Sequence, residues 1–171
     1  MAETKKVVYI FTSFTALTIL IIACIGWPWM EVEFPVVTVK GGLWEICASQ
    51  GNSTWSDCSR LHLSDGRFAS KFKGTKACSI ISIIIAFIGT ILAHLSVTDH
   101  KISPAISGMV FLLAAVFAVA AACVYQSFFQ SWEDVLNGVK VSVGWAFVMQ
   151  WIGAVCVLFN AVYGCVLYRF A

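Results

Sequence analysis

Residues 77–97 read ACSIISIIIAFIGTILAHLSV, a run of twenty-one residues without an Asp, Glu, Lys or Arg. The hydrocarbon core of a bilayer is about 30 Å thick, and one helical crossing requires about 20 predominantly apolar residues. The length and composition of this run therefore predict a transmembrane helix.

Three further runs of the same kind cover residues 7–26, 104–125 and 143–167. Only 12% of the 171 residues are charged and 60% are hydrophobic, whereas a soluble domain carries about 25% charged residues. We therefore predict an all-α membrane protein in which residues 1–171 form a single four-helix transmembrane bundle. The first run is long for a signal peptide and lacks a small-x-small cleavage site, so we interpret it as a retained span.

The connections between these runs differ in length. Residues 98–103 form a tight turn, residues 126–142 form a modest second outer loop, and residues 27–76 form a long first outer loop. The long loop contains β-rich stretches at 31–39, interrupted by Pro35, and at 43–48 after the turn signal Gly41-Gly42. We expect a small antiparallel β-sheet there, followed by a helical lead over 63–75 into the second span.

Two features of the long loop indicate that it is extracellular. Cys47 and Cys58 are the only cysteines outside the spans, and disulfides persist on the oxidising side of a membrane. The alternative is a pair of free thiols in a cytosolic loop. Asn52-Ser53-Thr54, between these cysteines, is an N-glycosylation sequon. A disulfide and a glycan at Asn52 would place the long loop outside a plasma membrane and both termini in the cytosol.

The distribution of Lys and Arg favours the opposite orientation. Cytoplasmic loops usually carry the excess of positive charge. The expected inner side carries Lys5, Lys6, Lys101 and Arg169. The long loop carries Lys40, Arg60, Arg67, Lys71, Lys73 and Lys76. We give the cysteine pair and the sequon more weight than this charge count.

Small residues recur at helical spacing in the second and third spans. Such residues let helix backbones approach closely within lipid. The predicted packing residues are Ser82, Ala86, Gly89, Ala93, Ala114, Ala118 and Ala122. We interpret them as contacts inside the bundle, and the alternative is a surface used by another chain. Cys165, near the inner end of the last span, is a candidate for palmitoylation.

The sequence contains no recognisable catalytic or metal-binding constellation. There is no nucleophile–base pair, no CxxC pair and no phosphate-binding loop, and the spans hold no Asp, Glu, Lys or Arg for an ion path. The net charge of +2 gives no reason to expect a nucleic-acid partner. We expect no enzymatic activity, no cofactor, no metal and no small-molecule substrate.

One set of residues in the long loop resembles a known signature. Trp29, the tripeptide Gly42-Leu43-Trp44, Cys47 and Cys58 are similar to the W–GLW–C–C pattern of the claudin superfamily, although Trp27 could also be the leading tryptophan. This superfamily includes the claudins, the peripheral myelin protein, the epithelial membrane proteins, the lens intrinsic protein and channel auxiliary subunits. Residues 113–125 and Gly144-Trp145-Ala146-Phe147 resemble the myelin and epithelial branch.

The resemblance implies partners in the bilayer rather than in solution. The first expectation is a tetraspan protein that organises cell–cell contact or membrane assemblies through its outer loops and helix faces. The alternative is an auxiliary subunit of an ion channel or receptor. A paracellular pore-former would have to self-assemble into strands. Tight-junction claudins usually end in a PDZ-binding Tyr-Val, whereas this sequence ends at residues 168–171 with YRFA, which argues against scaffold attachment.

Overall fold

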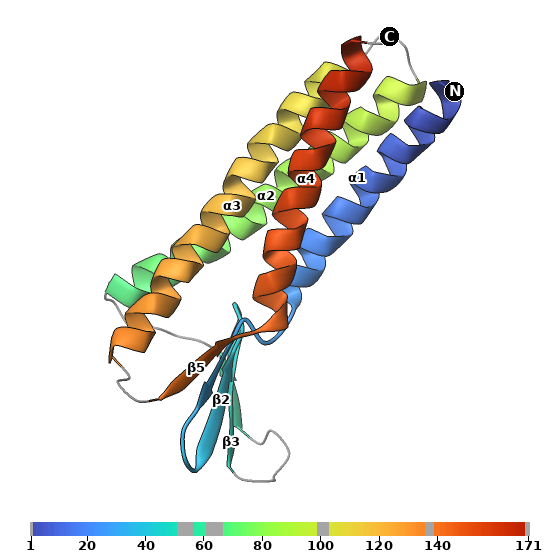
Figure 1. Cartoon of the computed structure of the whole chain (residues 1–171). Coiled ribbons are helices and arrows are strands. Elements are labelled where there is room, and N and C mark those ends of the chain that lie inside the picture. Colours follow the sequence, from blue (N-terminus) through green and yellow to red (C-terminus); the bar gives the residue numbers. More distant parts are fainter. Residues whose placement is uncertain (1, 51–56, 61–66, 99–102, 136–138, 170–171) are drawn as a thin grey trace.

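The computed structural model describes residues 2–50, 57–60, 67–98, 103–135 and 139–169 (Figure 1). Four helices lie side by side: α1 (Ala2–Ile25), α2 (Arg67–Thr98), α3 (Pro104–Val135) and α4 (Trp145–Arg169). Each contains a segment long and apolar enough to cross a membrane, so the predicted four-helix transmembrane bundle is confirmed. Both chain ends lie at one end of the bundle, and the sheet projects from the other (Figure 1).

The sheet contains five antiparallel strands in the order β4-β3-β2-β1-β5. The first outer loop supplies β1 (Met30–Glu33), β2 (Val37–Gly41), β3 (Glu45–Gln50) and β4 (Asp57–Arg60). The antiparallel sheet predicted in the first outer loop is confirmed, and a further strand that was not predicted extends it. The second loop adds β5 (Lys140–Val143), which pairs with β1.

The junction between β5 and α4 corrects the expected start of the last span. Val143 is the last residue of β5, and α4 begins at Trp145 rather than at residue 143. Gly144 lies between them, and its N–H donates to the carbonyl of Trp29 at 2.9 Å. A Cβ at this position would overlap the backbone of Pro28. The chain can therefore pass from strand to helix here only because residue 144 has no side chain.

Helices α2 and α3 are longer than the expected spans 77–97 and 104–125. Each has 32 residues and is about 48 Å long at 1.5 Å per residue, which exceeds the hydrocarbon thickness. Their extra turns pack on each other at the sheet end. The rings of Phe72 and Phe128 lie 5.7 Å apart, and Lys71 Nζ donates to the carbonyl of Ser127 at 3.2 Å. These contacts explain why the helices continue beyond the apolar runs.

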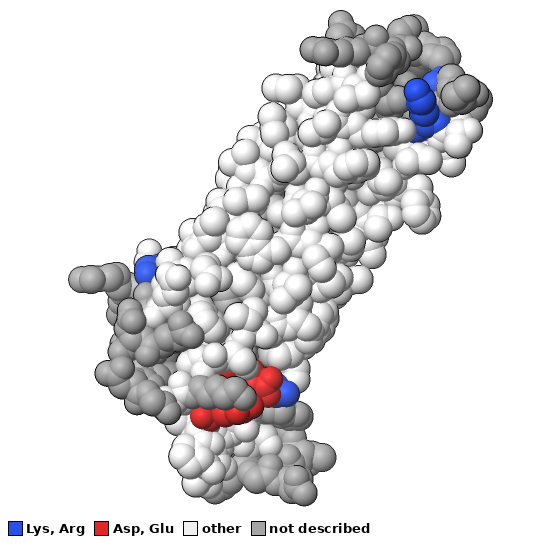
Figure 2. Space-filling view, in the orientation of Figure 1, with Lys and Arg blue, Asp and Glu red and all other residues white. Residues whose placement is uncertain are grey.

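The predicted packing residues all lie inside the bundle, and each is buried: Ser82, Ala86, Gly89, Ala93, Ala114, Ala118 and Ala122. Gly89 shows how closely the helices approach, since a Cβ there would lie 3.0 Å from the Phe111 ring. Large apolar side chains such as Ile84 and Phe87 point outward instead. Figure 2 shows the result on one face of the molecule, where a broad region without charged residues among those described separates two charged ends.

Two polar contacts connect α1 to its neighbours within the apolar belt. Thr12 Oγ1 donates to Asn160 Oδ1 at 2.8 Å, and Asn160 Nδ2 donates back to the carbonyl of Thr12 at 3.2 Å. The hydroxyls of Tyr9 and Ser107 are hydrogen-bonded at 2.7 Å. Because lipid offers no competing hydrogen bonds, such contacts fix the register of neighbouring helices.

Replacing Asn160 with leucine is expected to destabilise the bundle by about 0.6–1.7 kcal/mol, which spans the average and the largest effect of a hydrogen bond between transmembrane helices. The change removes both bonds to Thr12. The measurement is thermal unfolding of the purified protein in mild detergent. Thr15→Val is the control, because Thr15 Oγ1 bonds only to the carbonyl of Phe11 in its own helix. Equal stability of Asn160→Leu and Thr15→Val would contradict the prediction.

Candidate functional site at the junction of sheet and bundle

Trp29 lies at the centre of the junction between sheet and bundle and is fully buried. Its indole N–H donates to the carbonyl of Ala23 at 2.8 Å. Its ring contacts Tyr125 edge-on, with 4.9 Å between ring centres, and Phe147 at 5.9 Å. One side chain therefore joins the segment before β1 to α1, α3 and α4.

Trp44 makes a second contact with the end of α1. Its indole N–H donates to the carbonyl of Cys24 at 2.8 Å, while 41% of the residue stays exposed. The last four carbonyls of a helix have no partner within that helix. The indoles of Trp29 and Trp44 satisfy two of these carbonyls in α1, where the chain leaves the apolar belt. The two signature tryptophans thus act as a C-terminal cap for α1.

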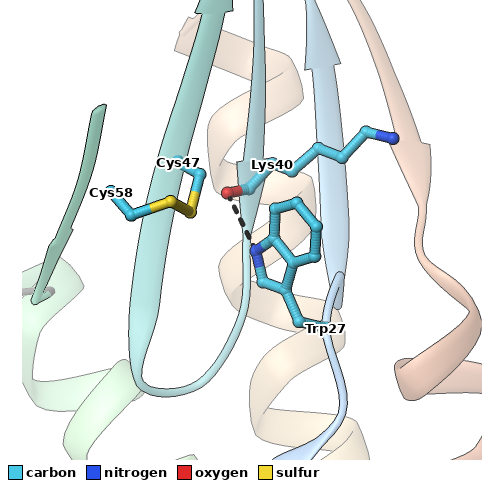
Figure 3. Close-up of a disulfide and its surroundings, with 4 residues drawn as sticks. All are labelled: Trp27, Lys40, Cys47 and Cys58. Atoms are coloured by element: carbon cyan, nitrogen blue, oxygen red, sulfur yellow. Dashed lines mark hydrogen bonds between the residues drawn. A yellow bond between two sulfur atoms is a disulfide. The ribbon is translucent and has the colours of Figure 1, made fainter. Parts of the chain in front are cut away.

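Gly42 and Leu43 form the turn between β2 and β3. The N–H of Gly42 donates to the carbonyl of Glu45 at 2.8 Å, and Leu43 is fully buried. A Cβ on residue 42 would lie 2.9 Å from Cδ1 of Trp27, so a glycine is needed for this close approach. The indole N–H of Trp27 in turn donates to the carbonyl of Lys40 at 3.4 Å (Figure 3).

Cys47 and Cys58 form the predicted disulfide (Figure 3). The two residues are directly opposite in the register of β3 and β4. Cys47 is buried and Cys58 is exposed. The crosslink therefore joins the edge strand β4 to the rest of the sheet.

A pocket of about 490 Å³ opens beside this junction. Its walls include Ile25 at the end of α1, the indoles of Trp27 and Trp44, the carboxylate-bearing residue Glu45, and the Cys47–Cys58 disulfide. Lys76 of α2 is not among the lining residues, but its ammonium lies 5.1 Å from the centre of the Trp44 ring, which forms part of the wall, and 4.6 Å from that of Phe72. The pocket thus combines aromatic walls with groups of both charges nearby.

The remaining predicted sites lie elsewhere. Asn52 falls outside the described residues. Cys165 is exposed on α4, near the end of the bundle that holds the chain termini, and lines an apolar groove of about 290 Å³ between α3 and α4. Within the described part of the chain, no group of three or more His, Cys, Asp or Glu residues could hold a metal ion.

Sequence reasoning missed the partners of the signature residues. Tyr125 and Phe147 pack on Trp29, and Lys76 lies over Trp44. Phe147 belongs to the segment 144–147 that the family resemblance singled out, but nothing in its spacing indicated a contact with Trp29. The contacts of Trp29 join residues 96 and 118 positions apart, and Lys76 lies 32 positions from Trp44. No local pattern encodes contacts over such separations.

The sequence model of one family, the PMP-22/EMP/MP20/Claudin family, matches residues 6–165. The chain belongs to this family. The resemblance inferred from the W–GLW–C–C pattern is therefore confirmed. No curated protein matches the chain significantly in a sequence comparison. Since the match to the PMP-22/EMP/MP20/Claudin family covers the sheet, α2, α3 and most of α1 and α4, the junction described above lies within the family domain.

Proposed function

We propose that this protein is a non-enzymatic organiser of membrane assemblies that uses its outer sheet and lipid-facing helix faces to bind other membrane proteins. The observation that carries the proposal is the junction, where Trp29 and Trp44 fasten the sheet to α1. A sheet held firmly on a membrane bundle presents its surface at a fixed height and angle. Such an arrangement suits lateral or face-to-face recognition, since preorganised surfaces lose less conformational freedom on binding.

The proposed orientation has the sheet outside a plasma membrane and both termini in the cytosol. The Cys47–Cys58 disulfide supports it, because the cytosol keeps thiols reduced. The sequon at Asn52 lies on the same loop as these cysteines. The basic residues of that loop would be an exception to the positive-inside rule.

Mutation of Asn52 tests this orientation. In animal cells the wild-type protein is expected to carry a glycan, so enzymatic deglycosylation increases its mobility on a gel, and Asn52→Gln abolishes this shift. Asn137→Gln is the control, because Asn137-Gly138-Val139 in the second outer loop is not a sequon. A wild-type protein without any mobility shift would contradict glycan occupancy and remove one support for the orientation.

The sheet offers a surface of mixed charge for recognition. Glu31 and Lys40 form an ion pair at 2.9 Å across β1 and β2, and the exposed residues Glu33 and Glu45 add acidic groups. Figure 2 shows acidic residues gathered at the sheet end of the molecule. Complementary charge patterns mainly determine specificity and association rate. We therefore propose that the sheet selects the partner and that the helix faces add contact area within the lipid.

Purification in mild detergent after crosslinking in cells, followed by mass spectrometry, tests the proposed function. The organiser role predicts crosslinks between copies of this chain or to other membrane proteins, weakened several-fold by Glu33→Lys on the sheet. Lys6→Glu, at the opposite end of the molecule, is the control. Stoichiometric recovery of one channel or receptor complex would favour an auxiliary subunit instead. Recovery of the monomer alone would contradict the proposal.

A further inference from the structure

We propose that the pocket beside the junction binds the headgroup of a choline phospholipid from the leaflet on the sheet side. The site consists of Trp27, Trp44 and Glu45 for the choline, and of Lys76 for the phosphate. Neither the family assignment nor the organiser role requires such a site. Its volume of about 490 Å³ falls within the range of roughly 300–1,000 Å³ typical of small-molecule pockets.

The aromatic walls select the cationic end of the ligand. Trp27 and Trp44 both line the pocket, and indole faces bind quaternary ammonium groups through cation–π attraction. Glu45 lines the same pocket and is exposed, so its carboxylate supplies an opposite charge for the trimethylammonium. A primary ammonium is more strongly hydrated and gains less from the same walls.

The neighbouring lysine selects the anionic end. Lys76 Nζ lies 5.1 Å from the centre of the Trp44 ring, and an ammonium beside an indole remains able to bind a phosphate as a point charge. The pocket region therefore holds one acidic and one basic group. This matches a zwitterionic headgroup better than an anionic one, which Glu45 would repel.

The position of the pocket favours a membrane lipid over a soluble ligand. Ile25, the last residue of α1, lines the pocket and is 70% exposed. Trp44 caps the same helix end, where the apolar belt stops. A headgroup in the pocket would thus have its acyl chains beside the exposed apolar face of α1, which includes Ile21 and Ile22.

Native mass spectrometry of the full-length protein tests the site. The protein is exchanged into detergent with equimolar phosphatidylcholine, phosphatidylethanolamine and phosphatidylglycerol. The wild type is expected to retain phosphatidylcholine about fivefold over phosphatidylethanolamine, as cation–π attraction of moderate strength predicts. Glu45→Gln and Lys76→Gln should each lower the retention of phosphatidylcholine, and Trp27→Leu, which removes one aromatic wall, should abolish most of the preference over phosphatidylethanolamine. Glu33→Gln and Lys73→Gln, which change the same charges at exposed positions outside the pocket lining, should preserve it.

Several results of this experiment would overturn the assignment of a choline phospholipid. Equal retention of the three lipids, or a preference for phosphatidylglycerol, overturns the proposal. Loss of the preference in Glu33→Gln or Lys73→Gln also overturns it, because the effect would then follow total charge. Glycerophosphocholine, which has no acyl chains, should not displace the bound lipid at equal concentration. Displacement would show that a soluble choline compound is the ligand and would overturn the lipid assignment.

Discussion

The Trp29→Ala variant is expected to lose about 3–5 kcal/mol of stability, the usual cost of removing a buried Trp or Phe side chain. Trp29 is fully buried and contacts Tyr125 and Phe147. The substitution opens a cavity between three helices and leaves the carbonyl of Ala23 without its indole donor. In thermal unfolding in mild detergent, this variant should be among the least stable single substitutions in the chain.

Two further variants show how much of the effect of Trp29→Ala comes from the lost hydrogen bond and whether it depends on burial at the junction. Trp29→Phe keeps most of the ring but loses the N–H bond to Ala23, so it should cost about 1–3 kcal/mol, the penalty of one unsatisfied buried carbonyl. Phe159→Ala removes a ring of which 55% is exposed on the outer surface of α4, and it should leave the unfolding temperature nearly unchanged. If Trp29→Ala unfolds at the same temperature as Phe159→Ala, the junction does not hold the sheet on the bundle.

Breaking the Cys47–Cys58 disulfide is the second change with a large expected effect. The two residues are separated by 11 positions, and closing a loop of this size contributes about 3 kcal/mol by the chain-entropy estimate. Cys47→Ser also leaves Cys58 as an unpaired thiol. We expect this variant to be retained in the secretory pathway of animal cells, which surface biotinylation measures.

Two control variants accompany Cys47→Ser, one at a cysteine outside the disulfide and one at both cysteines of the disulfide. Cys123→Ser changes an exposed free cysteine of α3 and should reach the surface normally. The double variant with serine at both 47 and 58 removes the unpaired thiol but not the loss of the crosslink. If the double variant is delivered normally, retention of Cys47→Ser is due to the thiol and not to instability. Normal delivery of Cys47→Ser itself would show that folding does not need the disulfide.

The amino-acid sequence predicted the helices well because the bilayer imposes a simple rule of length and apolarity. It predicted their ends less well. The helical lead expected over 63–75 is confirmed from residue 67 on, as the start of α2. Residues 126–135, which were expected to be loop, are helical in α3, and contacts such as Phe128 with Phe72 hold them. Contacts of this kind lie between helices, so a reading of one segment at a time cannot find them.

The second outer loop illustrates the same limit. Residues 139–143 read VKVSV, a regular alternation typical of a strand. The short run could have been recognised, but its partner could not. β5 pairs with β1 because Gly144 brings the chain against Pro28 and Trp29. Similarly, the W–GLW–C–C pattern identified the family, while the capping of α1 by two indoles became visible only from the hydrogen bonds.

The position of β1 inside the sheet, with a partner strand on each side, has a consequence for synthesis at the ribosome. β1 pairs with β2 on one side and with β5 on the other, and the side chain of Ser142 bonds to the carbonyl of Glu31 across a separation of 111 residues. One edge of β1 therefore remains unpaired until three helices and most of the chain have been translated. A nascent or truncated chain would expose that strand edge to chaperones, and only the complete protein conceals it.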